Sequence, residues 1–314
     1  MRTKVLATVV AVVPLLICAT AAPGRKVMVI CAPGYPGTTE QAQPTLDAFA
    51  AAVARGAGLP QGTLGTVYFK TEQGGLARLA MPDAALALVR YPFFVEHGAG
   101  LSLTPRLAIV EESGSTEIWS LVARRGLVSS PASLDGWELT GMPGYAPTFV
   151  AGPLLGAWGT LPATARITFT PAVLSPLRRA AKGEKLAVLL DPTQAASLAT
   201  LPFAGDLEVL FRSKPLPGGI LCTVGDRLSA SEAKALSRAL LHLHESDDAK
   251  PILATMRIKR FEPVDPSSFE SARHKGAGAP AGDPPGVPRS SFPKGSAWQA
   301  RARVSAVDAA VHER

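Results

Sequence analysis

Aromatic residues and the short motifs of common enzymes are scarce or absent in this 314-residue sequence. Aromatic side chains make up 6% of the residues, which argues against a groove that stacks sugar rings and against a platform for single-stranded nucleic acid. The sequence has no G-x-S-x-G elbow, no G-x-x-x-x-G-K-[ST] phosphate loop and no G-x-G-x-x-G dinucleotide motif. Because the histidines are also few and no acid–base pair can be assigned, we expect a protein that is not an enzyme and needs no cofactor.

Cysteine is scarce as well, with three residues and no C-x-x-C pair. His242 and His244 are two positions apart on a predicted helix, so they point in different directions and do not chelate together. The sequence therefore predicts no metal site. Cys31 and Cys222 lie in apolar runs, where a disulfide between them and two free buried thiols are both open.

Positive charge is present but spread out. The formal net charge of +7 includes Arg2 and Lys4 at the start and a net of about three in residues 267–314, which leaves about +2 on the rest. That is too little for a basic stripe, so we expect no nucleic-acid partner.

The first residues have the pattern of a secretory signal peptide. Arg2 and Lys4 precede an uncharged run over residues 5–19, and Ala19-Thr20-Ala21 is a small-x-small cleavage site. A lipoprotein signal ending at Cys18 is the alternative, and the bulky Ile17 before it argues against lipidation. We expect removal of about the first 21 residues, a periplasmic location, and membrane association only through a partner.

Apolar strands alternate with helical patterns in the first half of the body. Strands are expected at residues 26–31, 62–70 and 83–89, with helices at 41–55 and 72–81. This alternation indicates an α/β fold with a parallel sheet covered on both faces. Ligands of such sheets lie beyond the carboxyl ends of the strands, which here lead to Tyr35 and to Arg90-Tyr91.

A second series begins near Ile118. It includes a Gly/Pro-rich loop at 141–147 with Tyr145, and then a helix expected at 148–158 whose first turn offers free N–H groups and Thr148. Asp191 ends a later strand, where it either faces a cationic part of a ligand or initiates a turn before Pro192. A strand at 220–224 and a long helix at about 229–244 complete the body, and residues 267–314 have the composition of a disordered tail.

Several segments resemble phosphate/phosphonate-type periplasmic substrate-binding proteins of ABC transporters. The similar segments are Pro82-Asp83-Ala84-Ala85-Leu86, Leu121 to Arg125 followed by Ser133-Leu134-Asp135-Gly136, Lys182 to Ala187, and Lys214 to Gly219. The resemblance spans roughly residues 27–266 and implies the type 2 periplasmic-binding fold, with two α/β lobes joined by two crossings. It departs at the ligand loop: the family's small hydroxyl residues are replaced by Gly144-Tyr145-Ala146-Pro147.

The resemblance also implies a domain organisation and a function. We expect a first lobe in residues 22–112, a second in 113–215, and a return to the first in 216–266. The expected role is capture of a small anionic, phosphate- or phosphonate-like ligand in an interlobe cleft, with an ABC permease as partner. Because the serines are missing, a sensory or scaffold protein that has kept the fold without transport is the alternative.

One site hypothesis follows. Arg90 and the helix beginning near Thr148 would hold an anion from opposite lobes, with Tyr35, Tyr91 and Tyr145 closing the pocket. The alternative is that Arg90 forms a structural salt bridge and the tyrosines fill the lobe interface.

Overall fold

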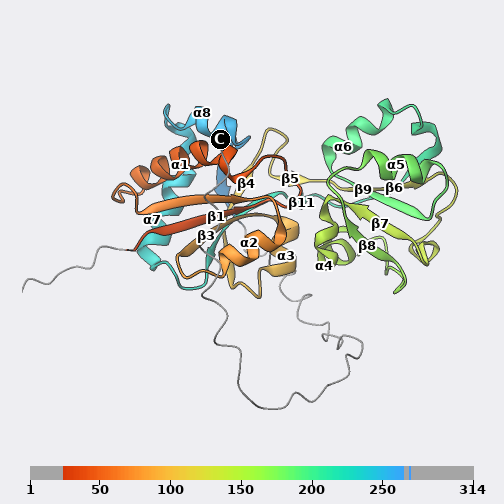
Figure 1. Ribbon diagram of the computed structural model, residues 1–314, viewed down its shortest axis with the longest axis horizontal. Helices are drawn as coiled ribbons and strands as arrows, with labels where there is room; N and C mark the ends of the chain where they lie inside the picture. Colours follow the sequence, from red (N-terminus) through yellow and green to blue (C-terminus); the bar gives the residue numbers. More distant parts are fainter. Residues whose placement is uncertain (1–23, 265–268, 270–314) are drawn as a thin grey trace, which may run out of the picture. The chain divides into compact units, whose positions relative to one another are not determined.

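The computed structural model describes residues 24–264 and Phe269 (Figure 1). Its strands form a six-stranded sheet, a five-stranded sheet and a two-stranded ribbon. The signal peptide and most of the tail expected from the sequence lie outside the described residues, so both stay predictions. No helix in the described part of the chain has the length and apolar character needed to cross a membrane.

The first sheet has the strand order β13-β4-β12-β3-β1-β2. Strand β1 pairs in parallel with β2 and β3, whereas β12 runs antiparallel to β3 and β4. β12 and the central strands β1 and β3 are almost wholly buried, as expected for strands covered on both faces. The bounds are β1 (Lys26–Cys31), β2 (Leu64–Phe69), β3 (Ala84–Arg90), β4 (Leu103–Val110), β12 (Gly219–Val224) and β13 (Arg260–Pro263).

Helices cover both faces of this sheet (Figure 1). One face packs against α1 (Thr39–Gly56), α7 (Ala230–Leu241) and α8 (Lys250–Thr255), and the other against α2 (Glu72–Leu79) and α3 (Tyr91–His97). Capping boxes at Thr38 and Ser229 start α1 and α7 by satisfying N–H groups that have no intrahelical partner.

The second sheet has the order β10-β6-β9-β7-β8. Strand β7 pairs in parallel with β8 and β9, and β6 pairs antiparallel with β9 and β10. Its elements are β6 (Ser120–Arg124), β7 (Glu138–Gly141), α4 (Pro147–Phe149), β8 (Arg166–Phe169), α5 (Leu174–Ala181), β9 (Leu186–Leu190), α6 (Pro192–Ser197) and β10 (Leu207–Arg212).

The chain passes between the sheets in two places, and the two crossings pair with each other. Strand β5 (Thr116–Glu117) lies antiparallel to β11 (Leu216–Pro217), with Leu216 opposite Glu117. The backbone N–H of Gly218 also donates to the carbonyl of Ser115. The two-stranded ribbon thus joins residues about 100 apart in the sequence.

The structure confirms the α/β fold with two sheets and corrects several details. The first sheet is mixed rather than purely parallel, because β12 returns antiparallel. The helix expected at 148–158 is a single turn, α4, followed by a π-helical segment over Val150–Leu154. Pro153 has no N–H to donate to the preceding turn, so the regular α-helical bonding cannot continue through it.

The cysteine question is also decided. Cys31 lies on β1 and Cys222 on β12, and β3 runs between those strands. Two strand spacings amount to roughly 10 Å, which exceeds the reach of a disulfide. Cys31 and Cys222 therefore do not bridge, and burial raises the pKa of the Cys31 thiol to about 12, with the nearby Glu72 adding to the effect. The lobe boundaries given above remain a proposal.

Candidate functional site

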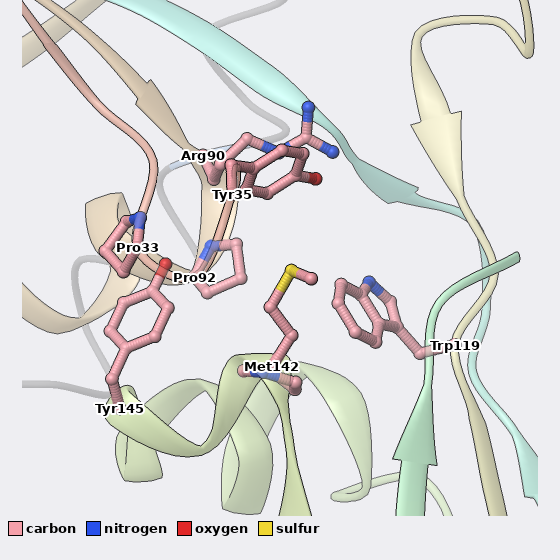
Figure 2. Close-up of a pocket in the computed structure, with 8 residues that line it drawn as sticks. Pro33, Tyr35, Arg90, Pro92, Trp119, Met142 and Tyr145 are labelled. Atoms are coloured by element: carbon pink, nitrogen blue, oxygen red, sulfur yellow. The ribbon is translucent and has the colours of Figure 1, made fainter. Parts of the chain in front are cut away.

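A small pocket lies beyond the carboxyl ends of β1 and β3. The loop after β1 supplies Pro33 and Tyr35, and Arg90 ends β3. Figure 2 shows these residues facing side chains from the second sheet. The full lining is Pro33, Tyr35, Arg90, Pro92, Trp119, Met142, Pro143 and Tyr145. The cavity volume is about 10 Å³, which is close to the room that a single water needs.

The second sheet contributes through a tight turn after β7. Met142 and Tyr145 belong to a 3₁₀ turn over Met142–Tyr145. A β-carbon on Gly144 would lie 1.9 Å from the carbonyl oxygen of Thr168 on β8, so only glycine lets the turn approach that strand. The glycine that replaces a family hydroxyl residue therefore has a packing role, and it places Tyr145 on the pocket wall.

Arg90 is held by two carboxylates. Its Nη1 donates to Glu111 Oε1 and its Nη2 to Glu117 Oε1. The guanidinium carbon also lies 5.2 Å from the centre of the Tyr35 ring. The Arg90 side chain is only 12% exposed. Glu111 follows β4 and Glu117 belongs to β5, so Arg90 ties the end of β3 to the crossing ribbon.

The electrostatics of this cluster favour a charged arginine and penalise a second charged glutamate. Burial acts against the guanidinium charge, but Tyr35, Glu117 and Glu111 outweigh it and raise the pKa of Arg90. Burial, with Glu111 and Asp191 adding to it, raises the pKa of Glu117 against the opposing effect of Arg90. Burial is the largest cause, and the presence of a second carboxylate at the same cation adds to it. Glu117 Oε2 is buried without a hydrogen-bond partner among the described residues.

Three neutral polar groups on the pocket wall are unpaired. Among the described residues, the hydroxyls of Tyr35 and Tyr145 and the Nε1–H of Trp119 have no hydrogen-bond partner. Burial raises the pKa of Tyr35 to about 12 and that of Tyr145 well above its usual range. Both tyrosines are therefore neutral at physiological pH, and together with Trp119 they offer three uncharged donors.

Other residues of the site hypothesis lie elsewhere. Tyr91 is a core residue, with its ring edge-on to Phe149 at 5.8 Å between centroids. Asp191 caps α6, accepting from the Gln194 N–H at 2.8 Å, which favours the turn interpretation. Thr148 is bonded to Glu96, described further below. The structure thus brings Tyr35, Arg90 and Tyr145 together and leaves Tyr91, Thr148 and Asp191 off the pocket wall.

Sequence reasoning missed Trp119, Met142 and the two glutamates. Trp119 directly follows the crossing strand β5, and because aromatic residues are scarce in this sequence, its position could have been noticed without the structure. Glu111 follows β4 and Glu117 lies on β5, and no sequence motif marks either residue. Nothing local to them indicated a shared partner, because Arg90 lies more than 20 residues away. Across the described residues, no cluster of three or more His, Cys, Asp or Glu could hold a metal ion.

Comparison with known proteins agrees with this architecture. Residues 181–269 match the family model described as the periplasmic substrate-binding protein of phosphonate ABC transporters. The structure of this chain also resembles the binding-protein component of an ABC phosphonate transporter from Pseudomonas aeruginosa, with a TM-score of 0.55 at 14% identity over 80% of this chain and 86% of that one. The fold is that of a phosphonate-type periplasmic substrate-binding protein. The resemblance expected from the sequence is confirmed.

Two further solved structures have a fold similar to that of this chain. A Xanthomonas citri protein solved with a bound chloride ion gives a TM-score of 0.59 at 16% identity, over 80% of this chain and 96% of that chain. PhnD1 from Prochlorococcus marinus, solved with methylphosphonate, gives 0.50 at 15% identity, over 80% of this chain and 97% of that one. No curated protein matches the sequence.

The family model that matches residues 181–269 describes proteins that bind a substrate in the periplasm for an ABC transporter.

Proposed function

We propose that this chain is an extracytoplasmic solute-binding protein that captures one small ligand in the pocket between Tyr35 and Tyr145, for delivery to an ABC importer. The observation that carries the proposal is that three unpaired neutral donors and one buried arginine line the same pocket, with contributions from the elements of both sheets. A pocket with apolar walls and a few aimed polar groups is the usual form of a small-ligand site.

The charge balance refines the ligand class. Arg90 is already paired with Glu111 and Glu117, and Asp191 is close enough to act on the pKa of both Tyr35 and Glu117. This cluster has more carboxylates than cations, so a doubly charged anion would meet net repulsion. The neutral donors suit a ligand whose oxygens accept hydrogen bonds. We therefore propose a small oxygen-rich ligand with at most one negative charge.

Binding requires side chains to move, because the cavity holds little more than a water. Met142 is the residue best suited to yield, since its unbranched side chain has three rotatable bonds. Figure 2 shows it between Trp119 and Pro92.

A set of ligands with one shape and different charge tests the proposal. Methylphosphonate at pH 9 carries two charges, methanesulfonate one and dimethyl sulfone none. We expect thermal stabilisation and calorimetric heat with methanesulfonate or dimethyl sulfone, and a weaker response to methylphosphonate. A ligand at about 100 times its dissociation constant stabilises the folded protein by about 2.7 kcal/mol, which a thermal-shift assay resolves.

Matched variants locate the binding. Tyr145→Phe removes a hydroxyl from the pocket and should weaken a hit about tenfold, as expected for one lost hydrogen bond. Tyr91→Phe removes a hydroxyl outside the pocket and should leave affinity unchanged. Equal loss in both variants would contradict the assignment, and tightest binding of the dianion would contradict the charge argument.

A second function is favoured by one specific observation. Both anion-capable groups expected from the sequence, Arg90 and Thr148, already hold carboxylates of the chain itself. A non-transport sensory or scaffold protein would need no free donors. Failure of every ligand in the set, together with genes for a kinase or electron-transfer system next to this gene instead of a permease and ATPase, would favour that role.

A further inference from the structure

We call the first sheet with its helices the first half of the chain, and the second sheet with its helices the second half. The carboxylate of Glu96 bridges α3 of the first half and α4 of the second half. Its Oε2 accepts from the backbone N–H of Thr148 at 2.9 Å, and its Oε1 accepts from the Thr148 hydroxyl at 3.1 Å. Glu96 lies in the last turn of α3, which packs on the first sheet. Thr148 lies in α4, which follows the 3₁₀ turn after β7 of the second sheet.

The position of Glu96 on its own helix is unfavourable. The last turn of a helix exposes carbonyl groups with partial negative charge, which repel an anion. Thr148 supplies the opposite environment, because Pro147 has no N–H and the Thr148 N–H is the first free donor of α4. The contact with Thr148 therefore compensates for a local cost on α3.

An aromatic contact lies beside this fork. Phe149, the residue after Thr148, packs its ring against Tyr91 of α3 and against Trp119, with centroid distances of 5.8 and 6.3 Å. Tyr91 and Phe149 are 4% and 0% exposed. The rings supply non-directional burial, whereas the two hydrogen bonds of Glu96 are directional contacts between α3 and α4.

We propose that the Glu96–Thr148 fork is a latch that holds the two halves of the chain together in the absence of any ligand. The anion that joins α3 to α4 is a side chain of the protein itself, the carboxylate of Glu96. The latch concerns the ligand-free protein, so it stands or falls independently of the proposed ligand.

Distance measurement between spin labels tests the latch. Lys234 on α7 and Ala196 on α6 are exposed positions in the two halves, and the buried Cys31 and Cys222 escape labelling. In a chain with Lys234→Cys, Ala196→Cys and Cys18→Ser, we expect one narrow distance distribution without ligand. Adding Glu96→Ala should raise the population at other distances roughly fivefold to tenfold, the effect of losing about 1 to 1.4 kcal/mol of hydrogen bonding. Thr148→Val, which keeps the N–H and loses the hydroxyl, should give a smaller rise.

Glu72→Gln is the matched control. Glu72 contacts His97, the neighbour of Glu96 on α3, at 2.6 Å, but lies on α2 of the same half. This variant should leave the distribution unchanged, and circular dichroism should show all variants folded. Identical distributions for wild type and Glu96→Ala would overturn the proposal, as would an equal broadening in Glu72→Gln. Either result would leave the ligand screen unaffected.

Discussion

At the scale of single residues, Arg90 matters most. Because Arg90 is a charged residue after a wholly apolar strand, the sequence predicts that it binds ligand. In the structure it contacts two carboxylates of the protein and the ring of Tyr35. Its first role is thus structural: it joins the end of β3 to Glu111 and to the crossing ribbon at Glu117. A ligand in the pocket would therefore meet an arginine that is already paired with two carboxylates.

Replacing Arg90 should destabilise the fold. Arg90→Ala leaves two neighbouring carboxylates without a cation in a mostly buried site, which typically costs about 3 to 5 kcal/mol. Urea unfolding followed by circular dichroism measures the loss. Arg106→Ala is the control, because Arg106 is exposed and donates one bond to Thr223 at 3.2 Å, so it should cost about 1 kcal/mol or less. Similar stabilities for the two variants would contradict the structural role of Arg90.

Glu117 should make stability depend on pH. Because burial raises its folded pKa, the stability that it contributes is full below the unfolded pKa of about 4.3 and is lost as pH rises through the folded value. Glu117→Gln keeps an acceptor for Arg90 and removes the excess charge. We expect the variant to melt at a higher temperature than wild type at pH 8 and at nearly the same temperature at pH 4. A lower melting temperature at pH 8 would mean that the ionised carboxylate is net stabilising.

At the scale of elements, the turn after β7 decides the shape of the pocket. The segment was expected to be a loop leading into a helix of about three turns. It is instead a 3₁₀ turn, one α-turn and a π-helical segment, and the 3₁₀ turn packs against β8 and β9. Gly144 makes the close approach to β8 possible, and Pro153 prevents a regular helix afterwards.

Adding one methyl group at Gly144 should therefore disturb the site. Gly144→Ala forces the turn away from Thr168 and should cost at least about 1 to 3 kcal/mol, the range for overpacking. It should also weaken any ligand that contacts Tyr145. Gly205→Ala is the control, because nothing lies within 4 Å of its added β-carbon and its φ is not positive. Equal melting temperatures for the two alanine variants would show that the turn can shift freely.

At the scale of the described body as a whole, one apolar cluster includes strands of both sheets. Val29 and Val89 of the first sheet belong to the same buried cluster as Leu121 and Leu189 of the second. The aromatic residues Tyr91, Phe149 and Trp119 connect them. Shared burial of this kind couples the stability of the two halves.

The two halves should therefore unfold together. Of the four tryptophans, Trp119, Trp137 and Trp158 lie among the elements of the second sheet, and Trp298, outside the described residues, is replaced by phenylalanine for this test. Circular dichroism reports helices and strands of both sheets. Urea transitions followed by fluorescence and by circular dichroism should coincide, as a two-state transition requires. Two separated transitions would show that the shared cluster does not couple the sheets.

The sequence by itself determined the class of the fold. Apolar strands such as β1 and β3, separated by capped helices, follow local rules of periodicity and capping, which neighbours along the chain decide. The same locality explains why Tyr35, Arg90 and Tyr145 could be predicted for the site, since strand ends and tight loops are visible without knowledge of the contacts. The signal peptide is also local and stays a prediction.

Only the tertiary structure decided what those residues do. Arg90 meets Glu111 and Glu117 after separations of 21 and 27 residues, and Glu96 meets Thr148 after 52. Such pairs depend on strand order and on the ribbon of the two crossings, which no local pattern specifies. Tyr91 was predicted to line the pocket because it follows Arg90, but it is the first residue of α3 and its side chain is buried in the core. The charge of the pocket is thus a property of long-range packing, because each charged group acquires its partner only when the sheets have formed.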